Sequence, residues 1–184
     1  MLDLGANIGL FGALASSLWP RAQITAFEPD PANAAVHERA IAANGLGERW
    51  QLVRAAAGAS AGQVRFTAGL DASSHLADLP GDAAGADGTI TVERRDVLGL
   101  VAAADLVKLD IEGGEWAILV DPRFALGPPR AIVLEYHAAG CPSQDPRAAA
   151  FGALEAAGMR TAEIWHDEPG RVGMLWGWRP GAPA

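Results

Sequence analysis

The 184-residue chain has one cysteine, one lysine and one tyrosine, and it lacks any long apolar run. Because Cys141 stands alone, the chain can form neither an internal disulfide nor a cysteine-based metal cluster. No stretch approaches the roughly 20 apolar residues that span a bilayer. The N-terminus also lacks the basic segment and apolar core of a signal peptide. The sequence therefore predicts a cytoplasmic protein that has no membrane partner.

Positive charge is scarce as well. Lysine and arginine together number 14 against 22 aspartates and glutamates, which gives a formal net charge of −8. Such a surface repels a polyanion on average, so the composition disfavours nucleic acid as a partner. Arginine in place of lysine, together with abundant alanine, is typical of GC-rich bacterial coding.

Short apolar runs alternate with alanine-rich stretches, a pattern typical of an α/β protein with a parallel sheet. The strands expected from these runs are residues 1–4, 23–28, 50–55, 105–111, 131–136, 159–164 and 172–179. The helices expected between them are residues 8–18, 31–44, 115–120 and 146–157. The length suits a single domain over residues 1–184, with residues 180–184 as a frayed tail.

The middle of the chain has a different pattern. Residues 63–67 and 89–93 alternate apolar and polar side chains, as exposed antiparallel strands do. Between them, residues 68–88 are rich in Gly, Asp, Ser and Ala and are expected to form a loop excursion. Loops of this length are often functional. Ser74 and His75 in it are candidates for substrate contact, and a solvated polar loop is the alternative.

A glycine-rich turn, Asp3-Leu-Gly-Ala-Asn-Ile-Gly9, follows the first strand and opens a helix. Its glycines, Gly5 and Gly9, allow positive φ and a close approach to a ligand, and the helix N-terminus offers N–H groups to an anion. Asn7 replaces the middle glycine of the dinucleotide fingerprint. Glu28 ends the second strand, where an acid can accept ribose hydroxyls. These features predict a nucleoside pocket; the alternative is a tight turn in which Glu28 caps the next helix.

Charged side chains gather at two later strand ends. Strand alternation places Lys108, Asp110 and Glu112 on one side, and Glu135 and His137 together on the neighbouring strand. Ligands of open α/β sheets bind beyond the carboxyl ends of the strands, so both groups face the same crevice as the glycine turn. Buried charges are costly unless paired or functional, which predicts an acid–base or metal-binding group. The alternative is structural: Lys108 pairs with one carboxylate and Glu135 with His137.

With these segments, the chain resembles the FkbM-type family of S-adenosylmethionine-dependent methyltransferases. The matching segments are Leu2-Asp-Leu-Gly-Ala-Asn-Ile-Gly9, Ala26-Phe-Glu-Pro-Asp30, Val107-Lys-Leu-Asp-Ile-Glu-Gly-Gly-Glu115 and Leu134-Glu-Tyr-His137. The resemblance implies a three-layer Rossmann-like fold whose sheet is mostly parallel, with an antiparallel last strand. It further implies S-adenosylmethionine as the methyl donor and a hydroxyl acceptor on a small metabolite or sugar. The first strand is short for this family.

The resemblance also implies roles for single residues. The donor-binding residues that it implies are Asp3, Gly5, Asn7, Gly9, Glu28, Ala56 and Asp110. Glu28 would hold the ribose and Ala56 would lie near the adenine. Asp110 and Glu112 would face the sulfonium and the acceptor, which makes Glu112 a candidate for substrate binding together with Ser74 and His75.

Methylation of an alcohol needs a base, and we expect Asp110, Glu135 or His137 to serve as the catalytic group. The same three side chains are the candidate ligands if a divalent metal instead lowers the pKa of the hydroxyl. Two other functions stay open: a truncated, inactive donor-binding or scaffold domain, and a nicotinamide-dependent oxidoreductase. Trp176 and Trp178 alternate on one strand face, which fits a dimer surface or core packing.

Overall fold

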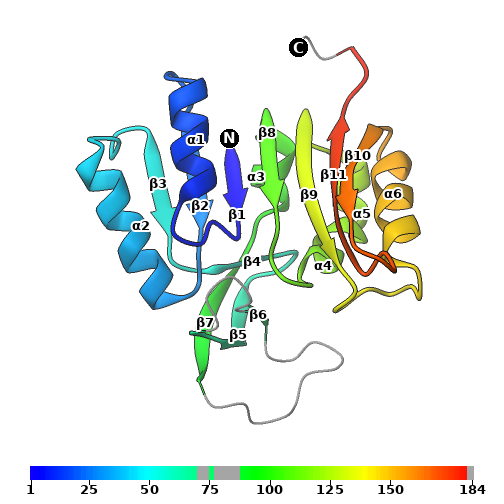
Figure 1. Cartoon of the computed structure of the whole chain (residues 1–184), viewed down its shortest axis with the longest axis horizontal. Helices are drawn as coiled ribbons and strands as arrows, with labels where there is room; N and C mark the ends of the chain where they lie inside the picture. The colour runs from blue at the N-terminus through cyan, green and yellow to red at the C-terminus, as the bar shows by residue number, and fades with distance from the viewer. Residues whose placement is uncertain (70–74, 77–87, 182–184) are drawn as a thin grey trace.

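The computed structural model describes residues 1–69, 75–76 and 88–181, and a seven-stranded sheet forms its centre (Figure 1). The order of its strands is β10-β11-β9-β8-β1-β2-β3. Their bounds are β1 (Leu2–Leu4), β2 (Ile24–Phe27), β3 (Trp50–Val53), β8 (Leu106–Leu109), β9 (Ala131–His137), β10 (Arg160–His166) and β11 (Val172–Trp178). Neighbours from β3 to β9 pair in parallel, whereas β11 is antiparallel to both β9 and β10. The predicted mostly parallel sheet with an antiparallel last strand is confirmed.

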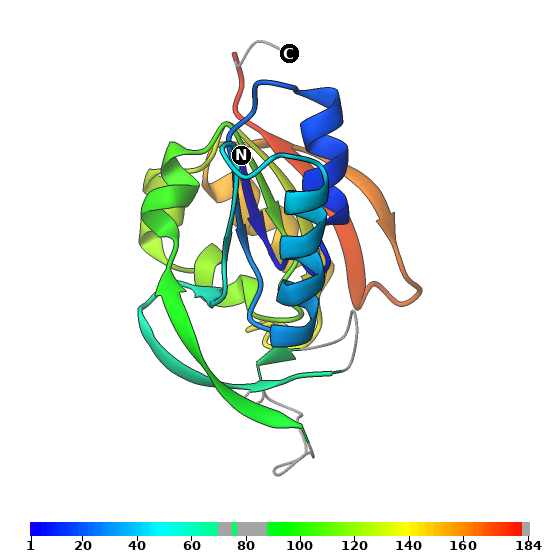
Figure 2. The ribbon, with the colours of Figure 1, turned by 90° about the vertical axis from the view of Figure 1, so that its left-hand side faces the viewer.

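Helices lie on both faces of this sheet, which confirms the predicted three layers (Figures 1 and 2). One face carries α1 (Leu10–Leu18) and α2 (Pro31–Ala43); the other carries α3 (Leu98–Ala103), α4 (Glu115–Leu119), α5 (Pro122–Leu126) and α6 (Pro146–Ala156). Each face has its own apolar core. Ile24, Ala26 and Trp50 belong to the core under α1 and α2, and Leu4 and Leu109 to the core on the opposite face. Because the inner strands are buried on both faces, they read as near-continuous apolar runs.

Two of the short helices, α3 and α5, are not predicted from the sequence. Helix α5 starts at Pro122, and the carboxylate of the preceding Asp121 accepts a hydrogen bond from the Arg123 N–H. Helices of five or six residues, such as α5 and α3, are too short to display a helical period. The longer helices α2 and α6 begin in the same way, with Asp30 and Asp145 as caps before a proline. None of the helices in the described part of the chain is long and apolar enough to cross a membrane.

A second sheet of four strands extends below the carboxyl ends of the main strands in Figure 1. Its strands are β4 (Ala56–Gly58), β7 (Thr89–Asp96), β5 (Gly62–Thr67) and β6 (His75–Leu76), in that order across the sheet. Residues 63–67 and 89–93, predicted as exposed antiparallel strands, lie in β5 and β7, and these two strands pair antiparallel with each other. The predicted excursion over residues 68–88 contains β6, which pairs with the end of β5. Ser74 lies outside the described residues.

The aromatic pair proposed for a dimer surface lies on β11. Trp176 and Trp178 are both half-buried, on the face of the strand opposite to the fully buried Leu175. Half-burial fits either interpretation, so their part in a dimer stays a prediction.

Candidate functional site

A pocket of about 310 Å³ opens where the parallel strands β1, β2, β8 and β9 end, at the edge expected for ligands of such sheets. The residues that line it are Gly5, Asn7, Phe27, Glu28, Pro29, Asn33, Ala56, Ala57, Phe66, Lys108, Asp110, Ile111, Glu112 and Glu135. Strands β4 and β5 of the second sheet contribute Ala56, Ala57 and Phe66. Most of the predicted site residues therefore share one cavity. Asp3, Gly9 and His137 do not line it, and the side chain of His75 lies outside the described residues.

The glycine turn packs directly against the end of β8. Gly5 has φ +77°, and a Cβ atom on it would lie 1.7 Å from the backbone oxygen of Asp110. Positive φ also occurs at Asn7 (49°) and Gly9 (92°). A side chain at position 5 would push the turn away from the strand, so glycine is required there by contact as well as by conformation.

The backbone N–H groups of residues 5–9 in this turn all donate hydrogen bonds within the protein. Those of Gly5 and Ala6 donate to the oxygen of Phe27, and that of Gly9 donates to the oxygen of Ala6. The Asn7 N–H donates to Glu28 Oε2, and the Ile8 N–H donates to Asn7 Oδ1. Internal hydrogen bonds therefore hold the turn in shape over residues 5–9, and the predicted anion contact stays a prediction for the first turn of α1, which begins at Leu10.

Glu28 is 5% exposed at the end of β2 and is oriented by the backbone. Its Oε2 accepts the Asn7 N–H at 2.7 Å and its Oε1 accepts the Asp30 N–H at 2.8 Å. Burial raises the pKa of Glu28, and these two hydrogen bonds counter the rise. Each carboxylate oxygen keeps a further lone pair for a ligand hydroxyl. Asp30, not Glu28, caps α2, since its Oδ1 accepts the N–H groups of Ala32 and Asn33.

A buried histidine supports the turn from behind, and sequence reasoning gave it no role. His37 of α2 is fully buried, and its Nδ1 donates to the Asn7 oxygen at 3.2 Å. Its ring meets Trp50 edge to face at 4.9 Å between centroids. A Cβ atom on Gly9 would lie 2.7 Å from His37 Cδ2. Gly9 therefore permits packing of the turn on His37 and does not face the pocket. The one available signal is a lone histidine in an alanine-rich helix.

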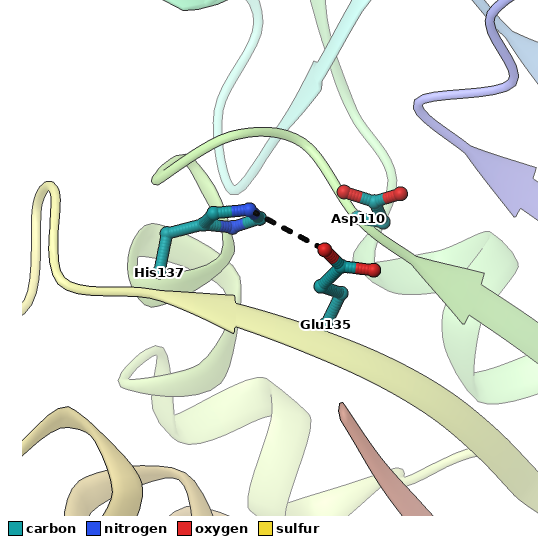
Figure 3. A group of neighbouring side chains, drawn as sticks. All are labelled: Asp110, Glu135 and His137. Carbon is teal, nitrogen blue, oxygen red and sulfur yellow. Dashed lines mark ion pairs between the residues drawn. The ribbon is translucent and has the colours of Figure 1, made fainter. Parts of the chain in front are cut away.

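Asp110, Glu135 and His137 come together at the ends of β8 and β9 (Figure 3). Each offers one possible ligand atom, and these three atoms lie within 4.8 Å of one another. His137 Nε2 is 3.8 Å from Glu135 Oε1 and 3.4 Å from Glu112 Oε2. Glu112 adopts φ +54°, which turns the chain between β8 and α4. The predicted cluster is thus assembled from two adjacent strand ends and the turn after one of them.

Glu115 is the partner that sequence reasoning missed. This carboxylate, in the first turn of α4, is fully buried; its Oε1 lies 3.0 Å from His137 Nδ1. It also accepts the N–H groups of Ile111 at 2.9 Å and Gly113 at 2.8 Å. The indole of Trp116 donates to the His137 oxygen. His137 therefore forms the expected ion pair with Glu135 at 3.8 Å and a closer, hydrogen-bonded pair with Glu115. The sequence signal that could have identified Glu115 is its position as the last acidic residue of the family-like segment Val107–Glu115.

The cluster holds a proton on His137. Burial by itself lowers the pKa of His137, but the hydrogen bond and charge of Glu115, with the charges of Glu112 and Asp110, raise it to about 9. Burial, followed by the charge of Asp110, raises the pKa of Glu135 against the opposing effect of His137. At neutral pH the imidazole is therefore cationic. It must lose a proton before Nε2 can accept one from a substrate or bind a metal.

Lys108, the single lysine, lies between the glycine turn and this cluster. Its Nζ donates to the Gly5 oxygen at 2.5 Å and pairs with Asp110 Oδ2 at 3.1 Å. Asp3 Oδ1 is 3.9 Å away. Asp3 is fully buried, its oxygens lack a hydrogen-bond donor among the described residues, and burial raises its pKa to about 6. The predicted pairing of Lys108 with one carboxylate is present, and Asp3 lies beneath the turn.

Solved structures show what class of protein has this fold. Methyltransferase FkbM from Methylobacillus flagellatus is 16% identical, with a TM-score of 0.61, over 97% of this chain and 43% of its own. Precorrin-6y C5,15-methyltransferase from Geobacter metallireducens is 17% identical, with a TM-score of 0.55, over 97% of this chain and 79% of its own. An O-methyltransferase family protein from Burkholderia thailandensis is 14% identical, with a TM-score of 0.51, over 99% of this chain and 51% of its own. At such identities the likeness shows the fold, which is that of methyltransferases.

The family follows from the sequence match. The model of the methyltransferase FkbM domain matches residues 3–156, so the chain belongs to the FkbM methyltransferase domain family. The predicted family is confirmed. No curated protein sequence matches the chain. The chain spans less than half the length of the Methylobacillus methyltransferase.

Proposed function

We propose that this domain binds S-adenosylmethionine in the pocket and transfers its methyl group to a hydroxyl of a small metabolite or sugar. The observation that carries the proposal is the orientation of Glu28, whose two oxygens are each held by a backbone N–H at the pocket wall. A carboxylate fixed in this way can accept both hydroxyls of a ribose. Gly5 also lines the pocket, and its lack of a Cβ atom lets the turn approach the backbone at the end of β8.

The other lining residues fit the remaining parts of this donor. Ala56, Ala57 and Phe66 give the pocket an apolar side that suits an adenine ring, while Asp110 and Glu112 suit the positive charge of a sulfonium. A volume of about 310 Å³ is at the lower end for small-molecule and cofactor sites. The partner in this proposal is a small hydroxyl-bearing acceptor, as the family resemblance implies, and the proposed location is the cytoplasm.

When bound, the donor supplies an electrophilic methyl group on its sulfonium, and the chain's task is to align the acceptor and to receive its proton. Glu135 is the base in this proposal because it faces the pocket and its pKa is raised towards neutrality. The protonated His137, 3.8 Å behind it, balances its charge. Glu115 fixes the ring of His137 so that Nε2 points to Glu135.

A divalent cation is the alternative means of activating the hydroxyl. Asp110, Glu135 and His137 would hold it, and Glu115 behind Nδ1 is the carboxylate partner that metal-binding histidines commonly have. The cation would act by lowering the pKa of the hydroxyl. Loss of turnover on adding a chelator, with recovery on adding Mn²⁺ or Mg²⁺, would favour this route over Glu135 alone.

Calorimetric titration tests donor binding. S-adenosylhomocysteine is expected to bind the wild-type domain and NADH is not. Glu28→Gln should weaken the S-adenosylhomocysteine complex by roughly 10- to 100-fold, because it removes a charged acceptor of hydrogen bonds. Glu48→Gln, at an exposed position, is the matched control and should leave the affinity unchanged. Binding of NADH in place of S-adenosylhomocysteine would support the oxidoreductase alternative instead.

Turnover tests the base. Glu135→Gln should lower the rate of S-adenosylhomocysteine formation by about 10²- to 10⁴-fold over a panel of sugars and small alcohols, with donor affinity changed less than about threefold. Glu168→Gln, exposed in the turn between β10 and β11, is the control. Equal rates for Glu135→Gln and wild type contradict the assignment. Donor binding without turnover on any panel member supports the inactive scaffold alternative.

A further inference from the structure

We propose that Lys108 is the counter-ion for the α-carboxylate of the methyl donor, so that it recognises the amino-acid end of the donor and not its nucleoside. This inference rests on the proposed function, since it takes the donor to be S-adenosylmethionine. It assigns a ligand contact to the one lysine of the chain.

The charges that line the pocket leave one place for an anion. Among the described lining residues, the charged side chains are Glu28, Lys108, Asp110, Glu112 and Glu135. Four are carboxylates, which suit the sulfonium and the α-ammonium of the donor but repel its α-carboxylate. A charge removed from water needs a partner, and Lys108 is the one cationic side chain in this lining.

The backbone of the glycine turn does not provide an alternative. All the N–H groups of residues 5–9 donate to acceptors inside the protein. A carboxylate that reached the turn would have to break one of these hydrogen bonds to gain a donor. The ammonium of Lys108 lies beside the same turn, 2.5 Å from the Gly5 oxygen.

The protein uses two of the three N–H donors of the Lys108 ammonium. An ammonium has three N–H donors. One goes to the Gly5 oxygen and one faces Asp110 Oδ2 at 3.1 Å, whereas Asp3 Oδ1 at 3.9 Å is beyond hydrogen-bond distance. The side chain is 14% exposed and lines the pocket. One N–H is therefore available to a ligand, and the buried Asp3 and the half-buried Asp110 hold the ammonium in place.

Three ligands that differ at the amino-acid end separate this role from a purely structural one. S-adenosylhomocysteine carries both the α-ammonium and the α-carboxylate, S-adenosyl-3-thiopropylamine keeps only the amine, and 5′-methylthioadenosine has neither. The wild-type domain should bind S-adenosylhomocysteine roughly 10- to 100-fold more tightly than the amine, because a charged hydrogen bond is lost. Calorimetry measures the three dissociation constants.

Lys108→Met should abolish the preference for S-adenosylhomocysteine over the amine and leave the affinity for methylthioadenosine within about threefold. Lys108→Arg keeps the charge and should retain part of the preference. Arg65→Met, on β5, is a control outside the described lining and should keep the full preference. A Lys108→Met variant that still prefers S-adenosylhomocysteine, or that weakens all three ligands equally, overturns the proposal. Failure of the wild type to bind any of the three would instead refute the proposed function.

A measurement on the wild-type chain covers the case in which Lys108→Met does not fold. Because the chain has one lysine, labelling with ¹⁵N-lysine gives a single side-chain ammonium resonance. S-adenosylhomocysteine should shift that resonance and slow its hydrogen exchange, whereas S-adenosyl-3-thiopropylamine and methylthioadenosine should change it much less. Equal shifts with all three ligands contradict the contact.

Discussion

Gly5→Ala is expected to abolish binding of S-adenosylhomocysteine and to lower the free energy of unfolding by about 2–5 kcal/mol. A left-handed conformation costs a non-glycine residue about 1–2 kcal/mol, and overpacking adds about 1–3 kcal/mol. The Cβ atom would lie 1.7 Å from the Asp110 oxygen. That oxygen belongs to the backbone and cannot rotate away, so the turn must move and take Asn7 and its bond to Glu28 with it.

Gly45→Ala is the matched control for this effect. Gly45 has φ +64° at the end of α2, and a Cβ atom there would meet nothing within 4 Å. This variant should lose only the conformational part, about 1–2 kcal/mol, and should bind S-adenosylhomocysteine as the wild type does. Denaturant unfolding and calorimetry measure both quantities. Equal losses of stability in the two variants would show that the contact with β8 has no energetic importance.

Glu115→Ala is expected to lower the free energy of unfolding by about 3–5 kcal/mol, the usual cost of breaking a buried ion pair. The change leaves His137 without its partner and leaves the N–H groups of Ile111 and Gly113 without an acceptor. The turn that carries Asp110 and Glu112 should therefore lose its shape. Glu155→Ala, at an exposed position of α6, should change stability by less than about 0.5 kcal/mol.

The contribution of the Glu115–His137 pair to stability depends on pH, whereas the effect of a packing defect does not, and Glu115→Gln separates the two. The pKa of His137 is raised from 6.5 to about 9 on folding, so its contribution to stability is complete below about pH 6.5 and is lost as pH rises through about 9. The stability difference between wild type and Glu115→Gln should be largest near pH 6.5 and should shrink above pH 9. Denaturant unfolding at several pH values measures it. A difference independent of pH would show that Glu115 does not set the pKa of His137.

Much of this domain could be predicted from local sequence. The apolar runs of the central strands predict a parallel sheet because strands buried on both faces carry apolar side chains throughout. Glycine between a strand and a helix predicts a positive φ, which Gly5 and Gly9 adopt. Acids at the ends of β2, β8 and β9 predict a shared crevice because parallel strands end at the same edge. Each inference needs only the residues within one strand, turn or helix.

The contacts between elements were decided only by the tertiary structure. The sequence marks Glu115 as a helix-start acid, yet its burial against His137 depends on how α4 packs beside β9. It marks Gly9 as a turn residue, yet only the position of α2 shows that Gly9 packs on His37. The sequence by itself determined that a glycine turn and several carboxylates meet at one sheet edge. The structure decided which groups line the pocket, because burial and hydrogen-bond partners depend on elements far apart in the chain.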